Sequence, residues 1–294
     1  MKKFYFIVAA VILLGLIFVF VNQSKMGKSS NKFQVTASFY PLYFFASAVG
    51  GDKAQVNNIT PAGSEPHDYD PSTQDIARIE NGKMLILNGG VEAWGDKIKD
   101  NLKGKDVKIV VAGEGLLRKG DPHVWLNPLL ARQEVGKITD GYIAIDPVNE
   151  SYYKNNESKL ELKLDQLDAD YKTGLANCQS KDIVTSHAAF AYLAGQYGLR
   201  QVAISGISPD EEPSAQQLGD VANFVKENNV RYIFFESLVS PKLSETIANE
   251  VGAKTLVLDP IEGLSDDNIK QGKNYFTVME DNLKNLQTAL SCSK

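Results

Sequence analysis

The sequence predicts an α/β protein of two lobes bridged by one long rigid helix, each lobe being a mostly parallel four-stranded sheet with flanking helices. Three observations lead to this fold class. Short apolar segments alternate with helical segments, the alternation falls into two sets, and a long segment without internal proline separates the two sets. The 294 residues are enough for two domains that each bury a core.

Eight short segments rich in aliphatic and β-branched residues are expected to be strands, four in each half of the chain. In order they are 34–37, 55–59, 84–87, 107–111, 182–185, 201–204, 232–235 and 255–258. Because helical segments separate them, each set predicts βαβ units and a parallel sheet.

Three helix starts can be located from the sequence. Two have the spacing of a capping box, and the third places a cap residue before a proline in the first turn. These pairs are Ser72 with Asp75, Ser214 with Gln217, and Ser240 with Pro241.

One long helix is expected between the lobes. Apolar residues there recur at spacings of four, three, four and four, which places them on one face. They are Leu160, Leu164, Leu167, Tyr171 and Leu175. A free coiled coil is the alternative, but the stripe lasts barely two heptads. We therefore expect a first lobe over 33–146, a linking helix over 147–178 that limits hinge opening, and a second lobe over 179–294.

The N-terminal segment 1–32 is expected to be a membrane anchor and spacer. Residues 4–21 are uncharged and apolar and follow two lysines. Eighteen helical residues cover about 27 Å, close to the roughly 30 Å hydrocarbon core. A cleaved signal peptide, the alternative, usually has an apolar region of about 7–15 residues and a small-residue cleavage site. No cysteine follows the run, which excludes a lipid-modified N-terminus. Whether this segment is an anchor or a cleaved signal peptide, the rest of the chain is expected to be extracytoplasmic.

Net charge and cysteine content bear on the partners of the protein and on its compartment. The net charge of −5 argues against a nucleic-acid partner, because no basic excess would neutralise phosphates. The two cysteines are Cys178, where the long helix meets the second lobe, and Cys292, at the end of a C-terminal helical stretch. We expect a disulfide between them, because an exported compartment permits one, and two free buried thiols are the alternative.

Three histidines occur in the whole chain, each in a turn or at a strand end. His67 follows the strand 55–59, His123 precedes a helix, and His187 ends the strand that begins at residue 182. Ligands of open α/β sheets bind beyond the C-terminal ends of strands, and imidazole is a common ligand of zinc-type ions. Prolines directly before His67 and His123 fix the backbone there. The residues alone leave open a metal site or three ordinary histidines.

Several motifs, in this order, resemble the metal receptors of zinc and manganese ABC importers. They are Tyr40-Pro-Leu-Tyr43, Glu65-Pro-His-Asp-Tyr-Asp-Pro71, Asp121-Pro-His-Val-Trp-Leu-Asn-Pro128, Ser186-His-Ala-Ala-Phe190, Phe235-Glu-Ser-Leu-Val-Ser-Pro-Lys-Leu243 and Leu256-Val-Leu-Asp-Pro-Ile-Glu262. The resemblance implies two lobes with metal in the cleft between them. It implies a monomeric receptor, not an enzyme, that binds Zn²⁺ and delivers it to an importer permease.

The resemblance also implies the ligands. It makes His67, His123 and His187 metal ligands, with a fourth in the loop after the last strand. We favour Glu262 because its separation from His187 fits the zinc-type pattern; Asp259 is the alternative, and could instead brace the loop.

The resemblance suggests a role for Glu236 in supporting a ligand, and the chain differs from many zinc receptors in one feature. Glu236 could hydrogen-bond a ligating histidine or could pair with a lysine such as Lys242. The long histidine-rich loop of many zinc receptors is missing, since 72–121 contains no histidine.

Three other functions compete with a zinc receptor. The first is a manganese receptor of the same family. A zinc-dependent hydrolase would need an open metal position for water, and no H-E-x-x-H motif is present. A metal-stabilised adhesin is the third.

Overall fold

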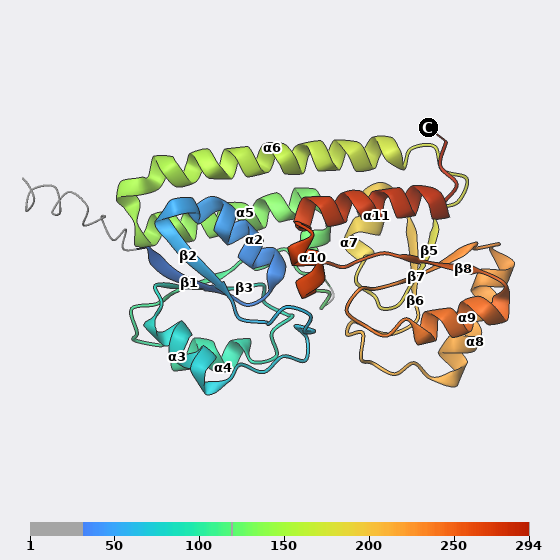
Figure 1. The fold of residues 1–294 in the computed structure, drawn as a ribbon, viewed down its shortest axis with the longest axis horizontal. Helices are drawn as coiled ribbons and strands as arrows, with labels where there is room; N and C mark the ends of the chain where they lie inside the picture. Colours follow the sequence, from blue (N-terminus) through green and yellow to red (C-terminus); the bar gives the residue numbers. More distant parts are fainter. Residues whose placement is uncertain (1–31, 119, 294) are drawn as a thin grey trace, which may run out of the picture. The chain divides into compact units, whose positions relative to one another are not determined.

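A computed structural model describes residues 32–118 and 120–293, and the chain from Phe33 onward forms one compact unit. The unit contains two four-stranded sheets with helices on both faces (Figure 1), which confirms the predicted fold class. The predicted anchor over residues 4–21 lies outside the described residues. Within the described residues, no helix is both long enough and apolar enough to cross a membrane.

The first sheet has the order β2-β1-β3-β4, and every pairing in it is parallel. Its strands are β1 (Phe33–Ala37), β2 (Ala54–Asn58), β3 (Met84–Leu87) and β4 (Lys108–Val111). All four residues of β3 are buried, as expected for a central strand covered on both faces.

The second sheet repeats this topology with the order β6-β5-β7-β8, again parallel throughout. Its strands are β5 (Asp182–Thr185), β6 (Arg200–Ala203), β7 (Tyr232–Phe235) and β8 (Lys254–Val257). In each sheet the chain moves outward on both sides of its first strand. Crevices at such switch points, beyond the C-terminal strand ends, are where α/β proteins bind ligands.

The helices cover both faces of each sheet. Those of the first lobe are α2 (Tyr40–Gly50), α3 (Thr73–Asn81), α4 (Gly95–Asn101) and α5 (Pro128–Ile145). Those of the second are α7 (Ala191–Tyr197), α8 (Ala215–Glu227), α9 (Lys242–Val251), α10 (Asp266–Lys270) and α11 (Tyr275–Ala289). Figure 1 shows α2, α5 and α11 on the same side as the long helix, with α3, α4, α8 and α9 on the opposite faces. Short 3₁₀ turns are η1 (Gly51–Lys53), η2 (Val124–Leu126) and η3 (Pro147–Asn149).

The linking helix is α6 (Glu150–Gly174), which packs on α2 and α5 of the first lobe and on α11 of the second (Figure 1). The predicted stripe is buried along it, and the Tyr171 hydroxyl donates to the Met279 carbonyl of α11 at 2.7 Å. The helix is shorter than the predicted 147–178, because Pro147 begins a separate 3₁₀ turn and the helix ends at Gly174. Its packing on both lobes is the feature that the sequence predicted.

Two of the three predicted helix starts are present. Ser72 with Asp75 and Ser214 with Gln217 form complete capping boxes. The third prediction is wrong by one residue: α9 is capped by Pro241, whose carbonyl accepts from the Glu245 backbone N–H at 2.9 Å. The described α9 start therefore has no side-chain cap.

Cys178 and Cys292 form a disulfide, as predicted. The bond joins the segment after α6 to the segment after α11, and the two cysteines are 114 positions apart in sequence. It therefore encloses the whole second lobe in one covalent loop.

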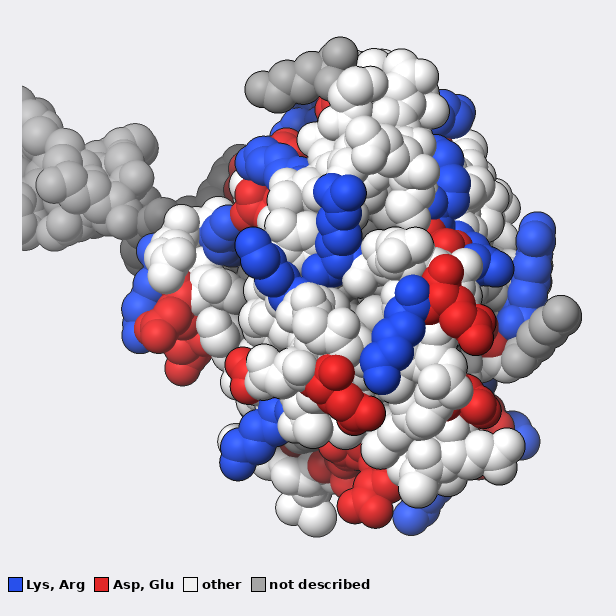
Figure 2. Space-filling model, turned by 90° about the vertical axis from the view of Figure 1, so that its right-hand side faces the viewer, with Lys and Arg blue, Asp and Glu red and all other residues white. Residues whose placement is uncertain are grey.

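Surface charge at the far end of the second lobe is mixed. Figure 2 shows basic and acidic side chains interspersed among uncharged ones on that face. This face therefore offers no single-sign field for a highly charged polymer.

Candidate metal centre

Four loops bring the predicted ligands together, and each follows the C-terminal end of a strand. His67 follows β2 and His123 follows β4 in the first lobe, while His187 follows β5 and Glu262 follows β8 in the second. One candidate ligand atom from each residue lies within 4.8 Å of all the others. Each lobe therefore supplies two of the four side chains.

The three imidazoles converge through their Nε2 atoms on one carboxylate oxygen. From Glu262 Oε1 the distances to Nε2 are 3.0 Å for His123, 3.2 Å for His67 and 3.5 Å for His187. His123 Nε2 lies 3.4 Å from the Nε2 atom of each of the other two histidines.

These separations fit a tetrahedral ion. Four ligands bound at about 2.0–2.1 Å around a tetrahedral Zn²⁺ lie about 3.3–3.4 Å from one another. Five of the six separations here are between 3.0 and 3.5 Å. The donor set, three neutral imidazoles and a carboxylate, suits zinc.

Two carboxylates fix which ring nitrogen faces the centre. Asp121 accepts from His123 Nδ1, and Glu236 accepts from His187 Nδ1, each at 2.7 Å. A proton held on Nδ1 leaves the Nε2 lone pair free for a metal. The alternative of a Glu236–Lys242 ion pair does not occur, since Glu236 is 3% exposed and also accepts from the His187 backbone N–H at 3.2 Å.

Asp259, the alternative fourth ligand, does not join the cluster. Its Oδ1 accepts from the Ile261 backbone N–H at 2.7 Å. Burial raises the pKa of Asp259 to about 6, although hydrogen bonds from Ser237 and Ile261 act in the opposite direction. The structure thus places Glu262 in the cluster and Asp259 outside it. Metal binding by the three histidines and Glu262 stays a prediction.

Burial and mutual attraction set the charge state of the cluster. Burial by itself would raise the pKa of Glu262, but hydrogen bonds from His123, His187 and His67 hold it well below its usual value. Burial would lower the pKa of His187, yet Glu236 and Glu262 outweigh this effect and raise it to about 10. The pKa of His123 is raised in the same way by Asp121 and Glu262. The cluster without metal therefore attracts cations, whether protons or a metal ion.

Glu65 is a partly buried carboxyl group in the loop that carries His67. Burial and the charge of Glu262 raise its pKa to about 9, and its Oε1 accepts from the His67 backbone N–H at 3.3 Å. It therefore supports the His67 loop as a neutral acid rather than as a general base.

Two hydrogen bonds that join the lobes beside the cluster could not be predicted from the sequence. The Trp125 indole donates to the Pro260 carbonyl at 2.7 Å, and the Gly63 N–H donates to the Leu264 carbonyl at 3.1 Å. These two bonds hold the segment around Glu262 against the first lobe. Each joins residues far apart in sequence, so no local pattern indicates it.

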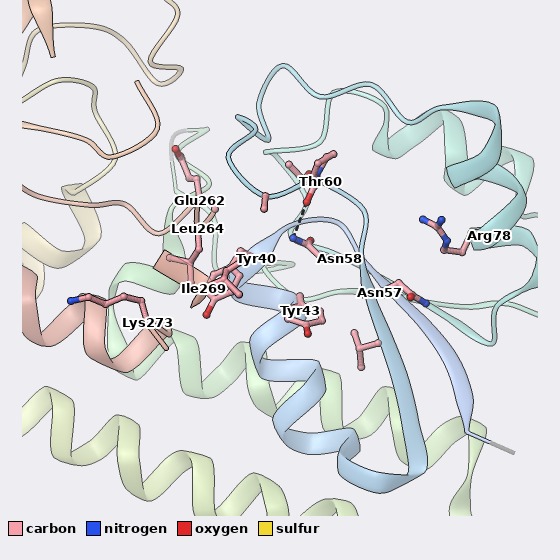
Figure 3. Close-up of a pocket in the computed structure, with 14 residues that line it drawn as sticks. Tyr40, Tyr43, Asn57, Asn58, Thr60, Arg78, Glu262, Leu264, Ile269 and Lys273 are labelled. Atoms are coloured by element: carbon pink, nitrogen blue, oxygen red, sulfur yellow. Dashed lines mark hydrogen bonds between the residues drawn. The ribbon is translucent and has the colours of Figure 1, made fainter. Parts of the chain in front are cut away.

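A cavity of about 540 Å³ lies beside the cluster, between β2 and α2 of the first lobe and the segment 262–273 of the second. In Figure 3 the Glu262 side chain points away from Tyr40 and Tyr43, which also line this cavity. Of the four candidate ligands only Glu262 lines the cavity, so the candidate centre lies adjacent to the cavity.

Comparison with known proteins gives consistent similarities. The model of the family described as zinc-uptake complex component A, periplasmic, matches residues 35–289. The "Zinc-binding lipoprotein AdcA" of Streptococcus pneumoniae is 39% identical over 98% of this chain and 61% of its own length. The chain thus spans about three fifths of that relative. The "High-affinity zinc uptake system protein ZnuA" of Bacillus subtilis is 37% identical over 92% of each chain.

A solved structure shows the same fold. The Zn(II)-bound ZnuA-like domain of Streptococcus pneumoniae AdcA matches with a TM-score of 0.80 and 43% identity, over 88% of this chain and 99% of that domain.

Proposed function

This chain belongs to the zinc-uptake complex component A family, and we propose that it is an extracytoplasmic receptor that binds Zn²⁺ and delivers it to the permease of an ABC importer. The observation that carries the proposal is the convergence of three buried or nearly buried imidazoles and one buried carboxylate at tetrahedral spacing. The names of the streptococcal and Bacillus relatives support the same metal.

The donor set favours zinc over manganese. Imidazole nitrogen is a preferred donor for zinc, whereas manganese is better served by oxygen donors, and at a given site zinc lies above manganese in the Irving–Williams order. A manganese receptor would be expected to replace one of these imidazoles with a carboxylate.

The same set argues against a hydrolase. His67, His123, His187 and Glu262 supply four donors, which fills a tetrahedral shell, while a catalytic zinc keeps a position for water. We therefore assign no catalytic residue to this chain.

Capture and release follow from the division of the ligands between lobes. A bound ion would be held by His67 and His123 from one lobe and by His187 and Glu262 from the other. The ion would thus hold the two lobes together, and release requires the lobes to separate or one ligand to withdraw. Because α6 packs on both lobes, a small displacement is favoured over a wide hinge opening.

Anchoring is proposed to differ from that of the lipoprotein relative. The apolar run over 4–21 has the length of a membrane-spanning helix, and no cysteine occurs before Cys178. We propose that this run tethers a monomeric receptor to the cytoplasmic membrane. N-terminal sequencing of the protein from its native membrane tests the tether, and a start within 22–33 would overturn it.

Zinc uptake by cells that lack the chain tests the receptor proposal. Cells complemented with the full chain should take up zinc at low concentration, and His187→Ala should abolish this uptake. Lys83→Ala is the control, because Lys83 pairs with exposed Asp106 beside the N-terminal end of β3, away from the cluster. Uptake by the His187→Ala cells equal to that of the control would refute the proposal.

A further inference from the structure

The backbone immediately before Glu262 adopts an unfavourable conformation. Ile261 has φ +60°, in the left-handed region, where an L-residue and above all a β-branched one is disfavoured. The other non-glycine residues with positive φ in the described chain are Asn229 and Ser291, and neither is β-branched. Ile261 is 0% exposed, so its side chain is held in the core. Such conformations persist only where the surroundings impose them, and they concentrate at functional sites.

Asp259 is hydrogen-bonded both to the backbone of this turn and to α11. Its Oδ1 accepts from the Ile261 N–H at 2.7 Å, and its backbone is held in turn by Asn282 of α11. The Asp259 N–H donates to Asn282 Oδ1 at 2.8 Å, and Asn282 Nδ2 donates to the Asp259 carbonyl at 2.7 Å. Both residues are at most 5% exposed, so water does not compete for these bonds.

Pro260, between Asp259 and Ile261, is held by a residue of the first lobe. The Pro260 carbonyl accepts from the fully buried Trp125 indole at 2.7 Å, and Trp125 lies two residues after His123. Consecutive residues before Glu262 are thus fixed by α11 and by the loop that carries another candidate ligand.

We propose that Asp259 is a positioning residue, which holds the left-handed turn at Ile261 and thereby places Glu262 Oε1 among the three histidines. This inference rests on the proposed function. It gives the two acids of the Asp259-Pro-Ile-Glu262 sequence different roles: Glu262 binds the metal, and Asp259 sets where Glu262 points. Without the Asp259 carboxylate, Ile261 returns to the favoured negative φ, the chain direction at Glu262 changes, and water takes the fourth metal position.

Cobalt(II) bound in place of zinc reports whether water has taken the fourth metal position, because the visible spectrum of cobalt(II) depends on its ligands. A water bound to a zinc-type ion loses a proton near about pH 7 in a buried site, so a spectrum that changes between about pH 6 and pH 9 indicates bound water. The full chain should give a spectrum that does not change with pH, and Glu262→Ala should give one that does. Asp259→Ala should behave as Glu262→Ala does, and Asp259→Asn, which keeps an acceptor for the Ile261 N–H, should behave as the wild type.

Affinity and a matched control complete the test. Asp259→Ala should weaken zinc binding about 10- to 100-fold, the usual effect of losing a residue that orients a ligand. Adding it to Glu262→Ala should cause little further loss, since both changes remove the same ligand. Asn285→Ala is the control: it removes a bond of 2.9 Å from α11 to the Val257 carbonyl, and should leave the spectrum unchanged.

The outcomes separate the inference from the proposed function. A wild-type spectrum for Asp259→Ala, with a changed one for Glu262→Ala, overturns the positioning role alone. A wild-type spectrum for Glu262→Ala removes Glu262 from the ligand set, and absence of zinc binding by the wild type refutes the proposed function itself.

Discussion

Removal of the Glu236 carboxylate should weaken zinc binding without removing a ligand. Glu236 accepts two bonds from His187, at 2.7 Å from Nδ1 and at 3.2 Å from the backbone N–H, and both residues are at most 3% exposed. In Glu236→Ala both donors lose their partner inside the protein, and the ring proton is free to move to Nε2, where it blocks the metal.

The expected loss of zinc affinity in Glu236→Ala is that of a residue that orients a metal ligand. Loss of a residue that orients a ligand costs about 10–100-fold in metal affinity, or about 1.4–2.7 kcal/mol. Because removal of Glu236 also lowers the pKa of metal-free His187 and so reduces competition from protons, we expect the lower part of this range at pH 8. Glu236→Gln, which keeps an acceptor, should lose less.

Competition titration against a chelator at pH 8 measures the loss, and calorimetry in two buffers counts the protons released. Glu236 raises the pKa of metal-free His187, so its removal should reduce proton release at pH 7. Asp281→Ala is the matched control, since Asp281 pairs with Lys273 and Lys284 on the surface of the same lobe. Affinity and proton release equal to those of the control would refute the orienting role.

Three further predictions concern stability and pH. Replacing Cys178 and Cys292 by serine should lower the free energy of unfolding by about 4–5 kcal/mol and Tm by about 10–20 °C, because a loop spanning 114 positions is opened; calorimetry showing an unchanged Tm would contradict this. Apparent zinc affinity should fall as pH is lowered through neutrality, because the pKa of metal-free His187 is raised to about 10 and protons compete with the metal; titrations at pH 6, 7 and 8 with equal affinities would exclude that competition. Burial raises the pKa of Glu134 in the folded state to about 8, above its usual 4.5, so the folded state binds more protons than the unfolded state. The contribution of Glu134 to the free energy of unfolding therefore falls as the pH rises from 4.5 to 8. Glu134→Gln should therefore gain stability relative to the wild type at pH 8 but not at pH 4.5, and a denaturant titration with the same difference at both pH values would contradict the assignment.

The fold was predictable because its signals are local. Short buried strands such as Met84–Leu87 and Asp182–Thr185 are continuous apolar or β-branched segments, and their bounds agree with the prediction. The apolar stripe of α6 likewise has a helical period that can be read without any partner. The start of α9 was misplaced because a serine before a proline also fits a turn that precedes the helix.

The candidate site was predictable only in part. The histidines stand at strand ends, which the sequence shows, and parallel strand ends converge at one edge of a sheet. The choice between Glu262 and Asp259 could not be derived from local pattern, because the segment that carries both acids is held by contacts between distant parts of the chain, such as the Trp125–Pro260 bond between the lobes. Such long-range contacts leave no periodic signal in the chain.

The most direct test of the central claim is a competition titration of the full chain with zinc and manganese. Three imidazoles and one carboxylate at tetrahedral spacing predict one site per chain that binds zinc far more tightly than manganese. Tighter binding of manganese, or zinc binding that survives His187→Ala unchanged, would contradict the account.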